Sequence, residues 1–143
     1  MEKPKIIKEL LWKKSIKNKL IENIEYYELM SHSLGGQSFD CELVDHSRNL
    51  EAPFVKWIYK KIDAEQKLAK LNKEIDTIYV KFDSLIEKLN DSREMIIITY
   101  RYELDKSWDE IGNELHFSES TIFRLHRSAI TQLCKMEEKN ELL

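Results

Sequence analysis

The sequence has few residues that break helices or form covalent links. Its 143 residues include three glycines, two prolines and two cysteines, and it contains no alternating run of β-branched residues. This scarcity of helix breakers favours an all-helical protein. Cys41 and Cys134 lie far apart in the sequence, so reduced thiols are expected rather than a disulfide.

The sequence also lacks the motifs of common enzyme and membrane classes. It has no Gly-rich phosphate loop, no HExxH motif and no nucleophile elbow. Asp40, Cys41, Asp45 and His46 match no common zinc spacing. No segment approaches the ~20 apolar residues of a membrane span, and the basic N-terminus lacks the apolar core of a signal peptide. We therefore expect a cytoplasmic protein that is not an enzyme, with no cofactor, no metal and no membrane contact.

Two long helices and a connecting loop are expected in residues 1–90. An amphipathic pattern predicts one helix over residues 4–33, and Gly35-Gly36 predict its end. Residues 34–53 are expected to form a long, flexible loop. The second helix is predicted over residues 54–90.

A heptad pattern in the second helix predicts a packed seam. Apolar residues recur there in alternating steps of three and four, which is typical of a coiled coil. These residues are Leu68, Leu71, Ile75, Ile78, Phe82, Leu85 and Leu89. The seam fits a hairpin with the first helix, a coiled coil with a second copy, or both. We favour a homodimer, because a second copy would cover the wide apolar stripes of such a stalk.

Residues 91–143 are expected to form a three-helix head. Asp91 or Ser92 is expected to cap its first helix. The inner side of that helix is assigned to Ile96, Ile97, Tyr100 and Leu104. The last residues, from Glu137, are expected to fray.

The second and third head helices have the pattern of a helix-turn-helix. Ser107 with Glu110 forms a capping box for a helix that ends near Leu115. The turn is His116-Phe117, with His116 expected in the left-handed region, and Ser118 caps the next helix. That helix is expected to turn Ile122, Leu125, Ala129 or Ile130, and Leu133 inward.

This stretch resembles the C-terminal helix-turn-helix of sigma factors, which reads the promoter −35 element. The resemblance is carried by Arg93-Glu94, Ile97 and Tyr100-Arg101-Tyr102, by Ser107-Trp108-Asp109-Glu110-Ile111-Gly112, and by Leu115, Ser118, Thr121-Ile122, Arg124-Leu125, Ala129-Ile130 and Leu133. In most heads of this family the position of His116 holds Gly. With its helical stalk, the whole chain resembles the phage and prophage late-gene regulators of the ArpU/RinA type.

The resemblance implies a set of DNA-contacting residues on the outer side of the last helix. Arg124 is suited to a guanine edge and Phe123 to a thymine methyl group. Glu119 would read a cytosine amino group or stabilise the helix N-terminus. The predicted DNA-binding residues are Lys106, Ser107, Ser118, Glu119, Ser120, Thr121, Phe123, Arg124 and Arg127.

The charge distribution complicates this interpretation. Residues 1–90 have 16 Lys and Arg against 15 Asp and Glu, whereas residues 91–143 have 7 against 11. The head is therefore the acidic part, although phosphate contacts usually dominate DNA affinity. No acid occurs from Ser120 to Lys135, so the helix is expected to keep a basic face with Arg124, Arg127 and Lys135. His126 is in the same run, but it lies two residues after Arg124 and is expected to face away from it.

The leading hypothesis is a dimeric, sequence-specific, DNA-binding transcriptional regulator of phage or prophage genes, which reads double-stranded DNA with the helix from about Ser118 to Lys135. The first alternative is a protein-interaction module whose sigma-like head binds RNA polymerase or another regulator. The second alternative is a DNA-recognition subunit of a phage packaging machine.

Overall fold

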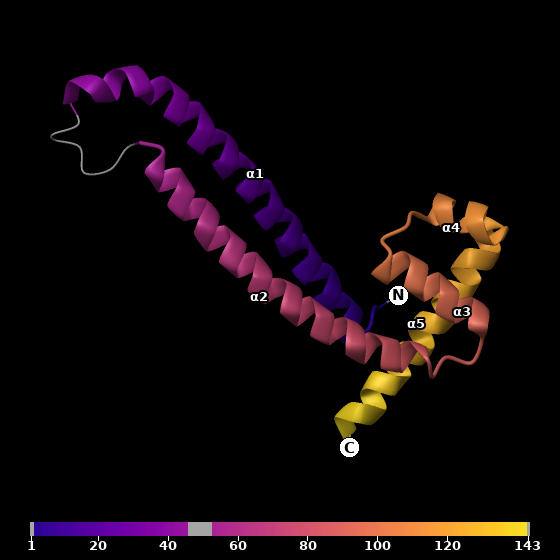
Figure 1. The fold of residues 1–143 in the computed structure, drawn as a ribbon. Coiled ribbons are helices and arrows are strands. Elements are labelled where there is room, and N and C mark those ends of the chain that lie inside the picture. Colours follow the sequence, from indigo (N-terminus) through magenta and orange to yellow (C-terminus); the bar gives the residue numbers. More distant parts are fainter. Residues whose placement is uncertain (1, 46–52, 143) are drawn as a thin grey trace. The chain divides into compact units, whose positions relative to one another are not determined.

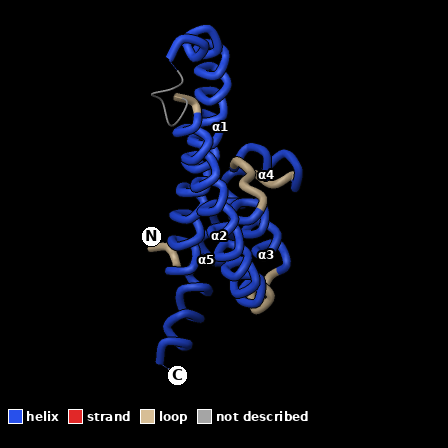
Figure 2. The backbone as a smooth tube through the Cα atoms, turned by 60° about the vertical axis from the view of Figure 1, so that its left-hand side comes forward, coloured by secondary structure: helices blue, strands red, loops and turns tan. Residues whose placement is uncertain are grey.

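The computed structural model describes the backbone of residues 2–45 and 53–142, with the side chains of residues 2–32 and 53–140. Every regular element in these ranges is helical (Figures 1 and 2). The elements are α1 (Lys5–Asp45), α2 (Val55–Ile86), α3 (Ser92–Ile98), a π-helix (Thr99–Glu103), α4 (Trp108–Leu115) and α5 (Glu119–Leu142). The all-α class is confirmed, with two long helices that pack as a hairpin followed by a three-helix head.

The chain divides into two compact units, each of which is described by itself. Residues 13–74 form the hairpin unit, and the head unit combines residues 1–12 with residues 75–143. The division into a dimerising stalk before residue 90 and a DNA-binding head after it concerns function, and it stays a prediction. In the part of the chain that the structure describes, no helix is long and apolar enough to cross a membrane.

The hairpin unit is an antiparallel pairing of α1 and α2. Lys13 pairs with Glu74 at 3.4 Å, whereas Glu28, further along α1, pairs with Lys61 at 3.7 Å. The Trp57 ring packs between the two helices, with its centre 5.7 Å from that of Tyr26. Partners later in α1 therefore lie earlier in α2, which fixes the antiparallel direction.

The predicted end of the first helix was wrong. Helix α1 continues through Gly35-Gly36 to Asp45. Each glycine costs a helix interior about 1 kcal/mol, but an established helix gains a backbone hydrogen bond for every residue added. Of the predicted loop, residues 46–52, including His46, lie outside the described residues. The side chains of Asp40, Cys41 and Asp45 lie outside them too.

Helix α2 also ends earlier than predicted, at Ile86 rather than at residue 90. The next residues form tight turns, in which the amide of Leu89 donates to the carbonyl of Ile86 at 3.0 Å. Such three-residue spacing is typical of a helix end. Leu89 is nevertheless buried, so the turn is part of the packed chain.

The predicted seam residues are packed within one chain. Leu68 is half-buried, and the other six are buried: Leu71, Ile75, Ile78, Phe82, Leu85 and Leu89. Phe82 is fully covered and meets the Tyr102 ring edge-on at 6.4 Å within the head unit. Intramolecular packing is thus sufficient to account for the heptads, and dimerisation through these residues stays a prediction.

The head unit has a core shared by α3, α4 and α5. Ile97, Ile111, Ile122 and Leu125 are buried together, one or two from each helix. Asp91 caps α3, since its carboxylate accepts the amide hydrogen of Arg93 at 2.9 Å. This outcome decides between the two caps that the sequence allowed.

The predicted inner side of the first head helix was wrong at two positions. Ile97 is buried and Tyr100 is half-buried, but Ile96 and Leu104 are exposed by 41% and 54%. A π-helix adds an extra residue to each turn and rotates the residues that follow. Tyr102 is consequently buried in place of Leu104.

The first residues of the chain are part of the head unit. Pro4, Ile7 and Leu10 are buried. The carboxylate of Glu137 in α5 accepts the amide hydrogens of Lys5 at 2.8 Å and of Ile6 at 2.9 Å. The predicted fraying from Glu137 was therefore wrong, because α5 continues to Leu142 and Glu137 caps the first turn of α1.

Candidate nucleic-acid interface

Helix α4 begins with the cap that the sequence predicts. Ser107 has an extended backbone, and its hydroxyl oxygen accepts the amide hydrogen of Glu110 at 3.1 Å. The same hydroxyl group donates a hydrogen bond to the Glu110 carboxylate at 3.3 Å. Asp109 and Glu110 lie in the first turn, where negative charge favours the helix dipole. The cap therefore explains why part of the head's acid lies on α4.

The turn between α4 and α5 has the geometry expected of a helix-turn-helix. His116 adopts the left-handed region at φ 58° and ψ 39°, as predicted. A Cβ atom on Gly112 would lie 3.3 Å from Ile122 Cδ1 and 3.4 Å from the Phe117 carbonyl oxygen, so the helices cross closely there. The Ser118 hydroxyl then accepts the amide hydrogen of Thr121 at 3.3 Å and caps α5.

Helix α5 separates into the inner and outer faces that the sequence predicts. Its buried residues are Ile122, Leu125, Ala129, Ile130 and Leu133, so both residues of the predicted choice at 129 and 130 are inside. Its exposed residues include Glu119, Ser120, Phe123, Arg124 and Arg127. An open groove follows this outer face and is lined by Ser120, Phe123, Arg124, Arg127, Ser128, Thr131, Gln132 and Lys135.

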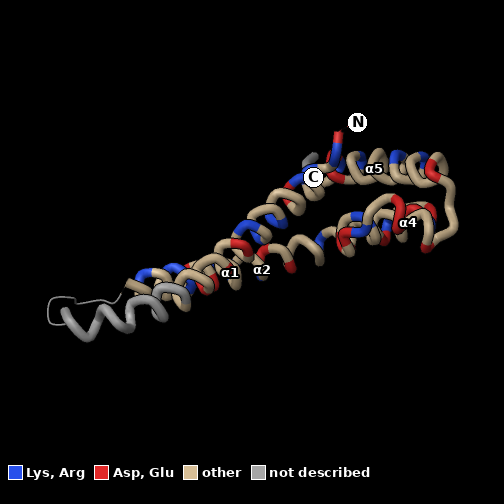
Figure 3. Tube along the Cα trace, turned by 90° about the horizontal axis from the view of Figure 1, so that it is seen from above, with Lys and Arg blue, Asp and Glu red and all other residues tan. Residues whose placement is uncertain are grey.

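The groove has three cations and no acid among its lining residues. Arg124 and Arg127 form no ion pair within the described part of the chain. Figure 3 shows the contrast between α5, with Lys and Arg along it, and α4, where Asp and Glu predominate. The arrangement keeps guanidinium groups available on one exposed helical face, which suits contact with phosphates and base edges.

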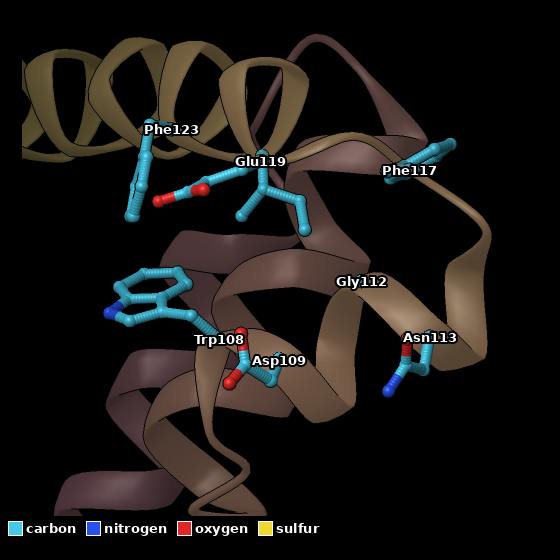
Figure 4. Close-up of a pocket in the computed structure, with 8 residues that line it drawn as sticks. Trp108, Asp109, Gly112, Asn113, Phe117, Glu119 and Phe123 are labelled. Atoms are coloured by element: carbon cyan, nitrogen blue, oxygen red, sulfur yellow. The ribbon is translucent and has the colours of Figure 1, made fainter.

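Phe123 lies at the edge of this groove and also lines a second pocket, between α4 and α5. Its ring centre is 5.3 Å from that of Trp108, in an edge-on arrangement (Figure 4). The pocket has a volume of about 360 Å³, and Asp109 and Glu119 contribute carboxylates to its lining. Trp108 is half-buried against the core, which agrees with a packing role.

Several predicted phosphate contacts already have partners inside the chain. The Lys106 ammonium pairs with Glu114 and lies 5.0 Å from the centre of the Tyr100 ring. Ser118 and Thr121 share a hydrogen bond of 2.8 Å between their hydroxyl groups. Hydroxyl groups can hold a cap and still accept or donate another bond. The charge of Lys106, by contrast, is largely compensated.

His126 is not on the basic face. It is buried, and its Nε2 lies 2.7 Å from the hydroxyl of Tyr102, with Trp108 edge-on at 4.8 Å. Burial, followed by the charges of Lys3 and Arg101, lowers the pKa of His126 to about 4. The ring is therefore neutral at pH 7, and His126 faces away from the exposed Arg124, as its position two residues later predicts. Its spacing from Ile122 and Ala129, four and three residues, already places it on the inner face.

A family comparison matches this arrangement. Residues 85–135 match the model of Sigma-70, region 4. The match begins near the end of α2 and includes α3, the π-helix, α4 and most of α5. A sigma-70 region 4 helix-turn-helix suggests a role in DNA binding and transcription. A search of curated proteins and a search of solved structures found no match.

Proposed function

We propose that the protein is a sequence-specific DNA-binding regulator of transcription, which places the outer face of α5 in the major groove. The observation that carries the proposal is the exposed face of α5 between Ser120 and Lys135, where Arg124 and Arg127 line a groove that has no acidic residue in its lining. A helix with its inner face packed and its outer face free is what a major groove accepts.

Individual roles follow from position on α5. Arg124 is proposed to pair with a guanine edge, and Phe123 to contact a thymine methyl group. Arg127 and the hydroxyl groups of Ser107, Ser118, Ser120 and Thr121 are proposed to contact phosphates, with Lys106 as a weaker contact because of Glu114. Glu119 is proposed to accept from a cytosine amino group.

The biological setting is also part of the proposal. The resemblance to ArpU/RinA-type regulators supports a phage or prophage gene as the target, in the cytoplasm of a bacterial host. Two copies would double the phosphate contacts and offset the acidity of a single head. Since Ile75 and Phe82 are already covered within one chain, a dimer that keeps this fold would form through other surfaces.

The test is a mobility shift of genomic fragments at low and at physiological salt. We expect a fragment that outcompetes bulk DNA, and the Arg124→Ala variant should bind it about 5- to 100-fold more weakly. The matched control is Lys139→Ala, which removes one cation from α5 outside the groove. If no fragment outcompetes bulk DNA at either salt concentration, the proposal fails.

A second candidate function, a protein-interaction module, is favoured by the pocket between α4 and α5. This pocket combines the apolar surfaces of Trp108 and Phe123 with the carboxylates of Asp109 and Glu119, a lining that repels phosphate. RNA polymerase or another regulator would then be the partner. Unchanged DNA behaviour of Arg124→Ala, together with loss of polymerase in a pull-down with the Phe123→Ala variant, would favour this function.

A further inference from the structure

A cavity of about 350 Å³ lies in the head unit on the inner side of α5. Its walls come from the N-terminal residues and the start of α1, the π-helix and the turn after it, the start of α4, and α5. They include Lys3, Arg101, Tyr102, Asp105, Trp108 and His126. His126 and Arg124 are two positions apart on a helix, so their side chains point to nearly opposite sides of α5. The cavity is therefore separate from the proposed DNA-reading face.

The charges around the cavity favour a single negative charge in a ligand. Lys3 and Arg101 supply two cations and Asp105 one carboxylate, while the His126 ring is neutral. The Arg101 guanidinium donates to the carbonyl of Lys106 at 3.1 Å and stacks at 4.5 Å from the centre of the Trp108 ring. A guanidinium has five N–H donors, so others remain for an anion.

The other walls are aromatic, and the backbone around them is unusual. Tyr102 and His126 stack with their ring centres 5.8 Å apart, and Trp108 stands edge-on to His126. Arg101 and Tyr102 both lie in the π-helix, a form that is frequent at functional sites. Asp105, two residues after it, has a positive φ of 55°. Backbone strain of this kind clusters at ligand-binding positions.

We propose that this cavity binds one small aromatic monoanion, an aryl carboxylate or aryl sulfonate, whose ring packs against Trp108 and whose acid group meets Lys3 and Arg101. The volume is in the range of small-molecule sites. Trp108 also contacts Phe123 on the outer side of the helix-turn-helix, so the ligand alters the DNA-reading helix. This last step rests on the proposed DNA-binding function.

The binding test is a titration of the full ¹⁵N-labelled chain with 2-naphthoate, followed by NMR. We expect saturable shifts of the Trp108 indole N–H and of the Arg101 and Tyr102 amides, with the Trp57 indole of the hairpin unit unchanged. The cationic analogue 2-naphthylmethylamine should bind at least about fivefold more weakly, because it meets like charge. The proposed site would be refuted if the Trp57 indole signal shifted as much as that of Trp108, or if the cationic analogue bound as tightly as 2-naphthoate.

A matched pair of variants isolates the anion contact. Lys3→Ala should weaken the binding of 2-naphthoate about two- to fivefold, the upper part of the range for one exposed ion pair. Lys88→Ala removes the same charge from an exposed position of the head unit that does not line the cavity, and should leave the affinity unchanged. Equal affinities of the two variants would contradict the proposal.

The effect on DNA is measured separately, with the fragment found in the mobility-shift experiment. Saturating 2-naphthoate should lower its affinity about threefold, because added negative charge weakens phosphate attraction. If NMR shows binding but DNA affinity stays constant, the coupling is refuted while the site stands. If no fragment binds, the proposed DNA-binding function and the effect of the ligand on it both fail. The NMR titration then still shows whether the cavity binds 2-naphthoate.

Discussion

The contact between Glu137 and the first turn of α1 provides the sharpest test of how the chain is organised. Glu137 accepts two backbone amide hydrogens, from Lys5 and Ile6, more than a hundred residues away. The Cys134 thiol, one turn earlier in α5, donates to the Glu2 carbonyl at 3.5 Å. The perturbation is Glu137→Ala, which removes the carboxylate and leaves both amides without it.

The magnitude follows from the two hydrogen bonds and the helix dipole. Each bond to a carboxylate at this partly exposed site contributes about 1 kcal/mol, and the negative charge at the N-terminus of α1 adds a few tenths. The loss should be about 2 kcal/mol in the free energy of unfolding. For a chain of this size that corresponds to a fall of about 5 °C in Tm.

The assay is urea unfolding followed by circular dichroism, together with amide hydrogen exchange of Lys5 and Ile6. Glu138→Ala is the matched control, because Glu138 is exposed on the same helix and this substitution removes the same side-chain atoms. We expect faster exchange of both amides in Glu137→Ala only. If the two variants unfold at the same urea concentration and exchange is unchanged, residues 1–12 are not anchored to the head as inferred here.

Three further predictions concern the helix-turn-helix. Burial lowers the pKa of His126 to about 4, so its contribution to stability is complete above the unfolded value of 6.5 and is lost as pH falls toward 4. Between these pH values the free energy of unfolding of the wild type, measured with urea, should fall by about 2 kcal/mol more than that of His126→Gln. His116→Gly should raise stability by about 1 kcal/mol, because glycine adopts φ 58° without a Cβ clash, and an unchanged melting temperature would contradict the strain. Gly112→Leu should cost about 2–3 kcal/mol in urea unfolding, since the Phe117 carbonyl cannot move aside, whereas Asn113→Leu at the exposed neighbour should cost little.

Local sequence signals predicted the helix-turn-helix well. The Ser107 cap, the left-handed His116 and the inward set from Ile122 to Leu133 were each confirmed. These features depend on residues within about one or two helical turns of each other, so neighbouring residues are enough to specify them. The exposure of Arg124 and Phe123 follows from the same periodicity.

Signals that depend on distant partners were less informative. A heptad seam shows that one face of a helix must be buried, but it does not show which segment covers that face. Phe82 is covered within its own chain, where the Tyr102 ring packs against it. Glycine propensity predicted a helix end at Gly35-Gly36 that α1 does not have, because a cost of about 1 kcal/mol per residue is easily offset in a long helix. The π-helix had no recognisable signal, and it exchanged Leu104 for Tyr102 in the core.

The sequence by itself determined the helical class, the caps of the helix-turn-helix and the two faces of α5, because these follow from short-range hydrogen bonding and helical periodicity. Only the tertiary structure decided that residues 1–12 belong with the head, that Glu137 caps a helix from the opposite end of the chain, and that the inward-facing His126 ring is buried deeply enough to be neutral. Each of these depends on which surfaces meet, and burial sets both the pKa of His126 and the cavity around it.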